Sequence, residues 1–145
     1  MKISIACDHG GFELKENLKK WLKENNYEVI DYGTNSLDSC DYPDFGRKAA
    51  EAVRDNLVDR GIVICTTGIG MSIVANKVKN VRCALVGNAD AASLTRRHND
   101  SNVLALGAKY TNLELAKEIT NVWLTTEFEG GRHQRRVDKI MDIEE

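Results

Sequence analysis

The stretch that says most about the fold is 61–72, which reads Gly61-Ile62-Val63-Ile64-Cys65-Thr66-Thr67-Gly68-Ile69-Gly70-Met71-Ser72. An apolar run ends at a thiol and continues as a glycine-rich turn, after which residues 73–77 have a helix-like composition. A buried strand that leads through such a turn into a helix is typical of α/β proteins. The backbone N–H groups of the helix start bind anions, and the thiol beside them is a potential base or nucleophile.

Three better-known motifs do not fit this turn. A Walker loop requires a lysine where this chain has Met71, and a dinucleotide-binding fingerprint requires a glycine where it has Ile73. A phosphatase loop of the Cys-x5-Arg type requires an arginine in place of Met71. The remaining interpretation is a thiol beside an anion-binding turn. From the turn alone, Cys65 is either catalytic or a buried structural cysteine.

The composition indicates one soluble, reduced domain. A chain of 145 residues can bury roughly two thirds of the surface that it exposes when unfolded, so it needs no disulfide or metal to fold. The four cysteines form no Cys-x-x-Cys pair and the N-terminus does not resemble a signal peptide, so we expect a cytoplasmic protein. A net charge of −2 argues against nucleic-acid binding, and no apolar run approaches the ~20 residues of a membrane span.

Short apolar runs alternate with helical patterns along the whole chain. The predicted strands are Lys2–Cys7, Glu28–Tyr32, Gly61–Cys65, Arg82–Val86 and Asn102–Leu106. The predicted helices are Phe12–Asn25, Asp44–Asn56, Met71–Lys77, Asp90–Arg97, Leu113–Leu124 and a last one after Gly130-Gly131. This βα repeat predicts a single Rossmann-like three-layer α/β/α domain with a parallel sheet of about five strands. The only proline, Pro43, is expected in a long polar loop from Gly33 to Asp44.

Ligands of open parallel sheets bind beyond the carboxyl ends of the strands. The residues expected there are Cys7-Asp8-His9-Gly10-Gly11, Cys65 with its turn, and Gly107-Ala108-Lys109. The fourth predicted helix ends in Arg96-Arg97-His98-Asn99-Asp100, where cations interact favourably with the helix dipole. From that segment alone, a structural role for His98 is the simpler explanation.

The segment Glu129-Gly130-Gly131-Arg132-His133-Gln134-Arg135-Arg136 is harder to explain by structure alone. A helix starting after Gly131 would carry three arginines in its first turns, where the helix dipole disfavours each cation by ~0.3–1 kcal/mol. Arg132 and Arg136 would share one face and could hold a phosphate with forked donors. The alternative is a solvated basic segment paired with Glu127 or Glu129.

Several motifs together resemble one family, the type B ribose-5-phosphate isomerases, nearly end to end and in the same order and spacing. The motifs are Cys7-Asp8-His9-Gly10-Gly11-Phe12, Asp41-Tyr42-Pro43, residues 65–72 with Ala75-Asn76-Lys77, Arg97-His98-Asn99-Asp100 with Asn102-Val103-Leu104, and Glu129-Gly130-Gly131-Arg132-His133. The resemblance implies interconversion of ribose 5-phosphate and ribulose 5-phosphate without a metal or other cofactor. It also implies at least a homodimer, possibly a tetramer, with a pocket between subunits and the C-terminal helix packed on a partner.

The resemblance also implies roles for individual residues. Cys65 matches the base that moves a proton between C1 and C2 of the open sugar through an enediolate, and His98 matches the ring-opening acid. Thr67 matches part of the anion hole. The implied substrate-binding residues are Asp8, His9, Thr66, Gly68, Ile69, Gly70, Ser72, Asn99, Lys109, Arg132 and Arg136. We expect the thiol, the acid and the arginine pair to lie at one end of the sheet.

One position departs from the family pattern, and two other functions remain open. Many relatives place an arginine where this chain has Lys109, which keeps the charge but loses the forked donor. Another branch of the family uses a carboxylate in place of the thiol, and Cys65 together with the non-acidic Ala75 places this chain in the thiol branch. The alternatives are an isomerase of allose or galactose 6-phosphate and a non-catalytic sugar-phosphate binding protein.

Overall fold

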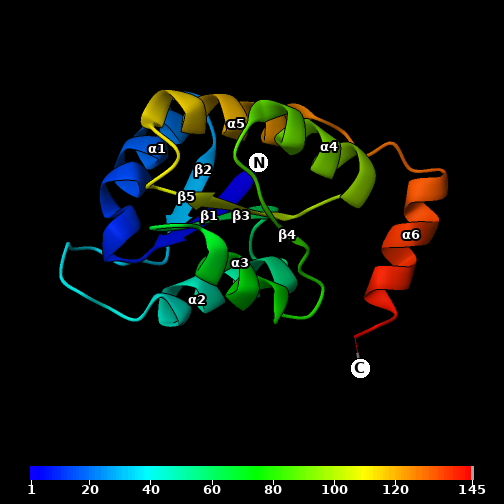
Figure 1. Cartoon of the computed structure of the whole chain (residues 1–145), viewed down its shortest axis with the longest axis horizontal. Coiled ribbons are helices and arrows are strands. Elements are labelled where there is room, and N and C mark those ends of the chain that lie inside the picture. Colours follow the sequence, from blue (N-terminus) through cyan, green and yellow to red (C-terminus); the bar gives the residue numbers. More distant parts are fainter. Residues whose placement is uncertain (145) are drawn as a thin grey trace.

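A central five-stranded parallel sheet organises the chain, for which a computed structural model describes residues 1–144 (Figure 1). The strands follow the order β2-β1-β3-β5-β4. Their bounds are β1 Lys2–Cys7, β2 Glu28–Asp31, β3 Arg60–Cys65, β4 Cys83–Leu85 and β5 Val103–Gly107. The helices are α1 Phe12–Glu24, α2 Tyr42–Arg54, α3 Ile69–Asn76, α4 Ala89–Asn99, α5 Leu113–Thr125 and α6 Arg132–Met141, with a short 3-10 turn η1 at His9–Gly11.

The predicted fold class and each predicted strand and helix are confirmed. The bounds differ by at most two residues, and one of these differences is at the start of α2, which begins at Tyr42 rather than Asp44. Pro43 therefore lies in the first turn of the helix and not in the preceding loop. Proline is well suited to that position because the first helical N–H groups have no partner inside the helix. The polar loop between β2 and α2 is therefore shorter than expected.

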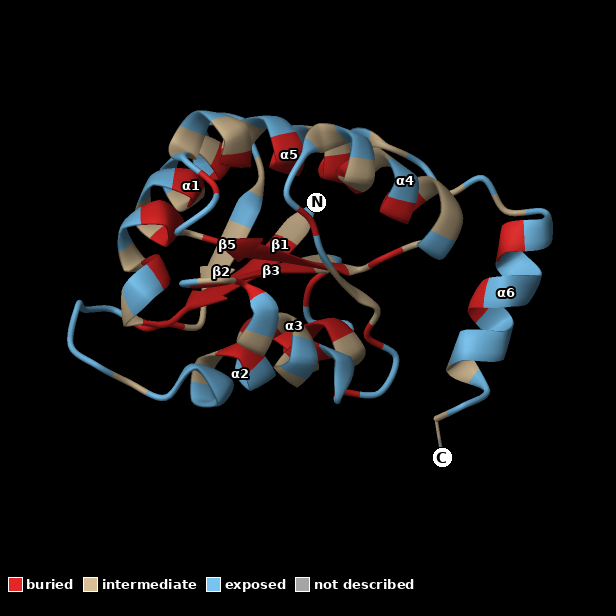
Figure 2. Ribbon diagram, viewed as in Figure 1, coloured by how far each residue is buried: buried red, intermediate tan, exposed pale blue. Residues whose placement is uncertain are grey.

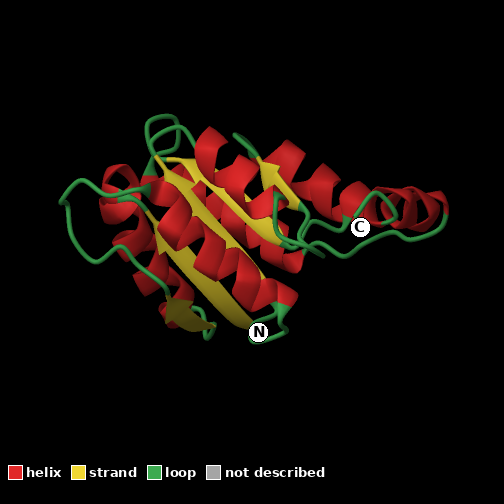
Figure 3. Ribbon diagram, turned by 90° about the horizontal axis from the view of Figure 1, so that it is seen from below, coloured by secondary structure: helices red, strands yellow, loops and turns green. Residues whose placement is uncertain are grey.

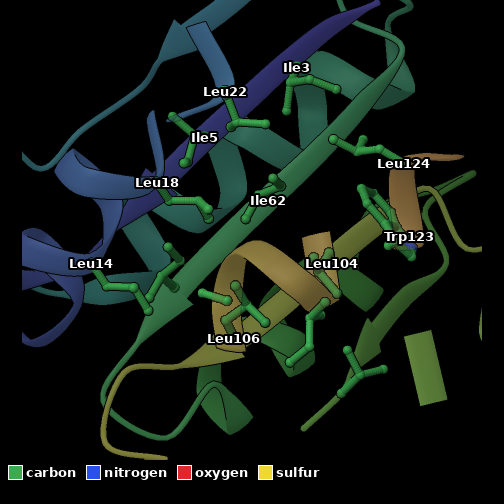
Figure 4. Close-up of a cluster of buried hydrophobic side chains, with 14 of the residues drawn as sticks. Ile3, Ile5, Leu14, Leu18, Leu22, Ile62, Leu104, Leu106, Trp123 and Leu124 are labelled. Atoms are coloured by element: carbon green, nitrogen blue, oxygen red, sulfur yellow. The ribbon is translucent and has the colours of Figure 1, made fainter. Parts of the chain in front are cut away.

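Helices cover both faces of the sheet. Figure 1 shows α1, α4 and α5 on one face and α2 and α3 on the other. Alternate residues of each strand therefore enter two separate cores: Ile62 and Ile64 of β3 pack under α1 and α5, whereas Val63 and Cys65 pack against α2 and α3. Figure 2 shows the buried residues concentrated on the sheet and the inner helix faces, and Figure 4 shows side chains of the core that contains Ile62. Among residues 1–144, no helix is long and apolar enough to cross a membrane.

The last helix, α6, lies apart from the three layers. It extends beyond the body of the domain in the views of Figures 1 and 3. Only His133 and Val137 of α6 are buried, and the end of the helix leaves Ile140 and Ile143 largely exposed. A helix with so little contact to its own domain carries an apolar stripe that a second copy of the chain could cover.

A buried lysine lies beneath the carboxyl end of β1. The Lys15 side chain is fully buried, and its Nζ lies 2.8 and 2.9 Å from the two carboxylate oxygens of Asp31 and 2.6 Å from the carbonyl oxygen of Thr34. Lys19 adds a further contact to Asp31 at 2.7 Å. Burial alone would raise the pKa of Asp31, but hydrogen bonds from the two lysines outweigh it and hold that pKa below its usual value. The network ties α1 to β2 and to the loop at residues 33–41.

Replacing Asp31 with alanine is expected to lower the free energy of unfolding by about 3–5 kcal/mol, because it leaves the Lys15 ammonium buried without its counter-ion. Because the pKa of Asp31 is depressed in the folded state, its contribution is complete above the ordinary carboxyl pKa of about 4 and is lost as the pH falls through the folded value. Urea denaturation at several pH values measures both effects. Asp55→Ala, which removes an exposed partner of Arg54, is the control and should change stability little.

Candidate active site

Cys65 ends the central strand β3 and lies against the turn that follows it. The backbone N–H of Gly68 donates to Cys65 Sγ at 3.2 Å. Gly68 has φ +79°, and a Cβ there would overlap Leu85 and the backbone of Leu106, so only glycine allows the chain to turn back over the sulfur. The sulfur of Cys65 is therefore in direct contact with a backbone N–H of the glycine-rich turn.

At the start of α3, beside the thiol, not every backbone N–H group donates a hydrogen bond within the chain. Thr67 Oγ1 accepts from the N–H of Ile69 at 3.3 Å, and Ser72 Oγ donates to the carbonyl oxygen of Ile69 at 2.7 Å. No acceptor within the described chain faces the N–H of Gly70. Two of the implied substrate-binding residues therefore use their N–H groups internally, Gly68 with the sulfur of Cys65 and Ile69 with Thr67. Of the three, only the N–H of Gly70 makes no hydrogen bond within residues 1–144.

The loops after β1 and β5 flank the Cys65 turn. Asp8 is buried and accepts from the N–H of Gly11 at 3.1 Å, which fixes η1. His9 Nδ1 accepts from the N–H of Cys40 at 3.3 Å, so the proton of a neutral His9 ring is carried by Nε2. The N–H of Lys109 donates to the carbonyl oxygen of Thr66 at 2.9 Å. A pocket of about 470 Å³ is lined in part by Gly10, Thr66 and Lys109.

His98 lies in the last turn of α4, against α6. Its ring stacks on that of His133 with centroids 4.3 Å apart and planes inclined by 14°. Glu129 Oε1 lies 3.4 Å from His133 Nε2, and Glu129 Oε2 lies 2.8 Å from Arg97 Nε. Asn99 is exposed in the same turn and lines a pocket of about 550 Å³ between α4, β4 and α6.

Arg132 and Arg136 are exposed on the first turns of α6. Within residues 1–144, neither has an acidic partner within 4 Å, because Glu129 is paired with Arg97 and His133 instead. Of the alternative explanation, a solvated basic segment paired with Glu127 or Glu129, the described residues show the exposure but no ion pair of either arginine with these two carboxylates. Two unpaired guanidinium groups one helical turn apart form a surface suited to a phosphate.

The expectation that the thiol, the acid and the arginine pair lie at one end of the sheet is wrong within one chain. Cys65 pairs with Gly107 at the carboxyl end of β5, whereas Asn99 precedes the amino end of the same strand by only four residues. The helix of a βαβ unit runs back against its strands, so α4 must end where β5 begins. About 15 Å of strand separates the two groups, given a rise of ~3.3 Å per residue. We call them the thiol half-site, which comprises Asp8, His9, the residues from Cys65 to Ser72 and Lys109, and the histidine half-site, which comprises His98, Asn99, Arg132 and Arg136.

The remaining cysteines differ from Cys65 in their surroundings. Burial raises the pKa of Cys7 and of Cys83 to about 12, which leaves both as neutral thiols. Cys40 lies on the loop beside His9, with its sulfur 3.9 Å from His9 Nδ1. Among these four thiols, only that of Cys65 accepts an N–H of the glycine-rich turn.

Two further residues lie against the histidine half-site, Glu129 and His133, and neither was predicted to have a role there. Their spacing of four residues across the start of a helix was the available signal. Together with His98 they offer ligand atoms within 4.8 Å of one another, which is a set of residue types that zinc can use. The two imidazole rings are nearly parallel, however, so their in-plane lone pairs do not converge on one point. The geometry is that of a stacked pair.

The fold and the two half-sites define a Rossmann-like α/β protein with a thiol beside the glycine-rich start of a helix. The chain matches the family model described as Ribose/Galactose Isomerase over residues 3–140. It is 48% identical to ribose-5-phosphate isomerase B of Escherichia coli, over 99% of this chain and 97% of that protein. This chain belongs to the ribose/galactose isomerase family.

Solved structures of high similarity support the same conclusion. The ribose-5-phosphate isomerase B of Clostridium thermocellum is 54% identical and superimposes with a TM-score of 0.98, over 99% of this chain and 97% of that one. That of Mycoplasma genitalium, solved with bound ribulose-5-phosphate, is 43% identical with a TM-score of 0.95, over 99% and 95% of the two chains. At these identities the likeness extends beyond the fold.

Proposed function

We propose that this chain is an aldose–ketose isomerase that interconverts D-ribose 5-phosphate and D-ribulose 5-phosphate. The observation that carries the proposal is the sulfur of Cys65, which accepts the N–H of Gly68 next to the free helix start of α3. A thiolate and an oxyanion-binding N–H side by side are what proton transfer next to a carbonyl requires. Relatives at 48% and 43% identity bear the name of this activity, and one of them was solved with ribulose-5-phosphate.

The chemistry assigned to the thiol half-site is a proton transfer between adjacent carbons. Cys65 removes the proton from C2 of the open aldose and returns it to C1, while the proton of the C2 hydroxyl moves to the oxygen on C1. The enediolate that forms between these steps carries its charge on oxygen. Thr67 and the N–H of Gly70 are the donors assigned to that oxygen, and such a donor can lower the barrier by ~3–4 kcal/mol.

The histidine half-site has two tasks in this proposal. His98 gives a proton to the ring oxygen as the bond from C1 to that oxygen breaks, while the C1 hydroxyl releases its own proton to water and becomes the aldehyde. Arg132 and Arg136 hold the phosphate, and Asn99 contacts the sugar. Asp8 and His9 hold hydroxyl oxygens and the far end of the substrate, with Lys109 as an additional cation.

Both tasks require a second copy of the chain, because the two half-sites lie at opposite ends of one sheet. In a symmetric homodimer, the thiol half-site of each copy would face the histidine half-site of the other. Exposed apolar side chains surround the Cys65 turn, as expected for a surface that another protein covers. They are Ile69, Ile73, Leu85 and Tyr110, with 52%, 57%, 42% and 64% of their surface exposed.

A comparison of substrates tests the proposal. We expect kcat/KM to be highest for ribose 5-phosphate, and at least tenfold lower for allose 6-phosphate and galactose 6-phosphate, because one additional carbon displaces the phosphate from a clamp on a rigid helix. A preference for either hexose would reject the pentose assignment.

Two further measurements concern the reaction itself. Binding without exchange of the C2 proton in deuterated water would indicate a sugar-phosphate binding protein. Activity should be unchanged by a chelator, because no step is assigned to a metal.

A further inference from the structure

The ring of His98 is held by a residue to which the mechanism above gives no task. His133 is buried between α4 and α6 and lies flat against His98, with a centroid distance of 4.3 Å. His98 itself is half-buried in the last turn of α4. A ring with one covered face has fewer orientations available than a free side chain at a helix end. The stack therefore fixes the plane in which the nitrogens of His98 lie.

Glu129 holds His133 in turn. Its carboxylate lies between His133 Nε2 at 3.4 Å and Arg97 Nε at 2.8 Å, and its backbone N–H donates to the carbonyl oxygen of Arg97 at 3.1 Å. The loop before α6 is thus attached to α4 through both backbone and side chain. His98 is the next residue after Arg97, so the same contacts fix the turn that carries it.

Burial and the surrounding charges favour the neutral form of the His133 ring. Desolvation and then the neighbouring His98, Arg132 and Arg136 lower the pKa of His133, while Glu129 opposes them. The cation facing Glu129 from α4 is Arg97, which has its own ion pair with the carboxylate.

We propose that His133 and Glu129 are positioning residues that hold His98 in the orientation needed for opening the sugar ring. The proposal rests on the function proposed above, in which His98 is the ring-opening acid. It goes beyond that function in assigning two residues to the opening step alone. Neither residue is given a part in the proton transfer at Cys65, which takes place at the thiol half-site of another copy.

Ring opening and proton transfer can be measured separately, because one substrate is cyclic and the other is open. Ribose 5-phosphate is mostly cyclic and must be opened, whereas ribulose 5-phosphate is open because its O5 is esterified and cannot close a five-membered ring. Exchange of the C1 proton of ribulose 5-phosphate with deuterated water, followed by NMR, therefore reports Cys65 without ring opening. His133→Ala should lower kcat/KM for ribose 5-phosphate about tenfold, a part of the ~10²–10⁴ that general acid catalysis contributes, and should change the exchange rate by less than about twofold.

A second substitution at position 133 shows whether His133 acts through the contact of its ring with His98 or through its charge. His133→Phe keeps a flat ring against His98, so it should restore most of the turnover of ribose 5-phosphate that His133→Ala loses. Glu129→Gln should lower the same turnover and spare the exchange. The matched controls are Gln134→Ala on the adjacent exposed position of α6 and Glu127→Gln in the same loop, and both should leave the two rates unchanged.

Three outcomes would overturn the proposal. The first is an equal loss of turnover and exchange in His133→Ala, which would indicate a general structural role. The second is a failure of His133→Phe to restore turnover although its melting temperature equals that of the wild type. The third is an unchanged turnover in both variants at position 133. His98→Asn tests the underlying function separately, because it should abolish ring opening and retain exchange whether or not His133 positions it.

Discussion

Replacing Cys65 with serine is expected to lower the turnover of ribose 5-phosphate by roughly 10²–10⁴-fold, the range that a general base contributes. A hydroxyl has nearly the size of a thiol, and it can still accept the N–H of Gly68, so the packing of β3 against α2 and α3 should survive. A serine hydroxyl is a far weaker acid than a thiol and supplies almost no anion near pH 7. Steady-state kinetics in both directions and exchange of the C1 proton of ribulose 5-phosphate measure the loss.

Cys83→Ser is the matched control, because the pKa of Cys83, raised to about 12 by burial, keeps that thiol neutral. Its turnover should equal that of the wild type.

Arg132→Ala gives a contrasting pattern, since the loss of one arm of the phosphate clamp should raise KM much more than it lowers kcat. Undiminished exchange in Cys65→Ser would contradict the assignment of the base.

A mixed dimer of two inactive chains is expected to regain activity. Cys65→Ser has an intact histidine half-site and His98→Asn has an intact thiol half-site, so a heterodimer of the two contains one complete pocket and one pocket with both defects. Coexpression with two different affinity tags, followed by purification on both, isolates that heterodimer. Its turnover of ribose 5-phosphate per dimer should be about half that of the wild type, which has two equivalent pockets.

The control for this experiment is a doubly tagged heterodimer of wild-type and doubly substituted chains, Cys65→Ser with His98→Asn. Each of its pockets receives one defective half-site, so it should have almost no activity although half of its chains are unaltered. If that control retained half of the wild-type activity and the first heterodimer had none, each pocket would be built from a single chain. The shared pocket would then be wrong.

Much of the fold could be predicted because its signals are local. Five apolar runs without polar alternation became the five parallel strands, and the thiol was predicted at the end of the strand that lies centrally in the sheet. The glycine at position 68 predicted a turn, and the structure shows the left-handed backbone that requires it. Asp8, Thr66 and Lys109 meet around that turn because the carboxyl ends of neighbouring parallel strands share one edge.

The rest depended on contacts between distant segments. His98 was expected near Cys65, although the antiparallel course of α4 relative to β5 carries it to the other end of the sheet. The stack of His98 on His133 depends on where α6 lies, and neither helix pattern specifies that position. Lys15 stands in an amphipathic helix among exposed charges, so its complete burial against Asp31 could not be anticipated from periodicity alone.

The course of β5 has a consequence for an assembled pair of chains. The strand begins three residues after Asp100, at the turn that carries His98, and ends at Gly107 against Cys65. In a dimer with shared pockets, these two ends would belong to different pockets. Five fully buried residues of regular strand then form the shortest covalent route between two catalytic centres, and any cooperativity between them would have a mechanical path through the middle of each sheet.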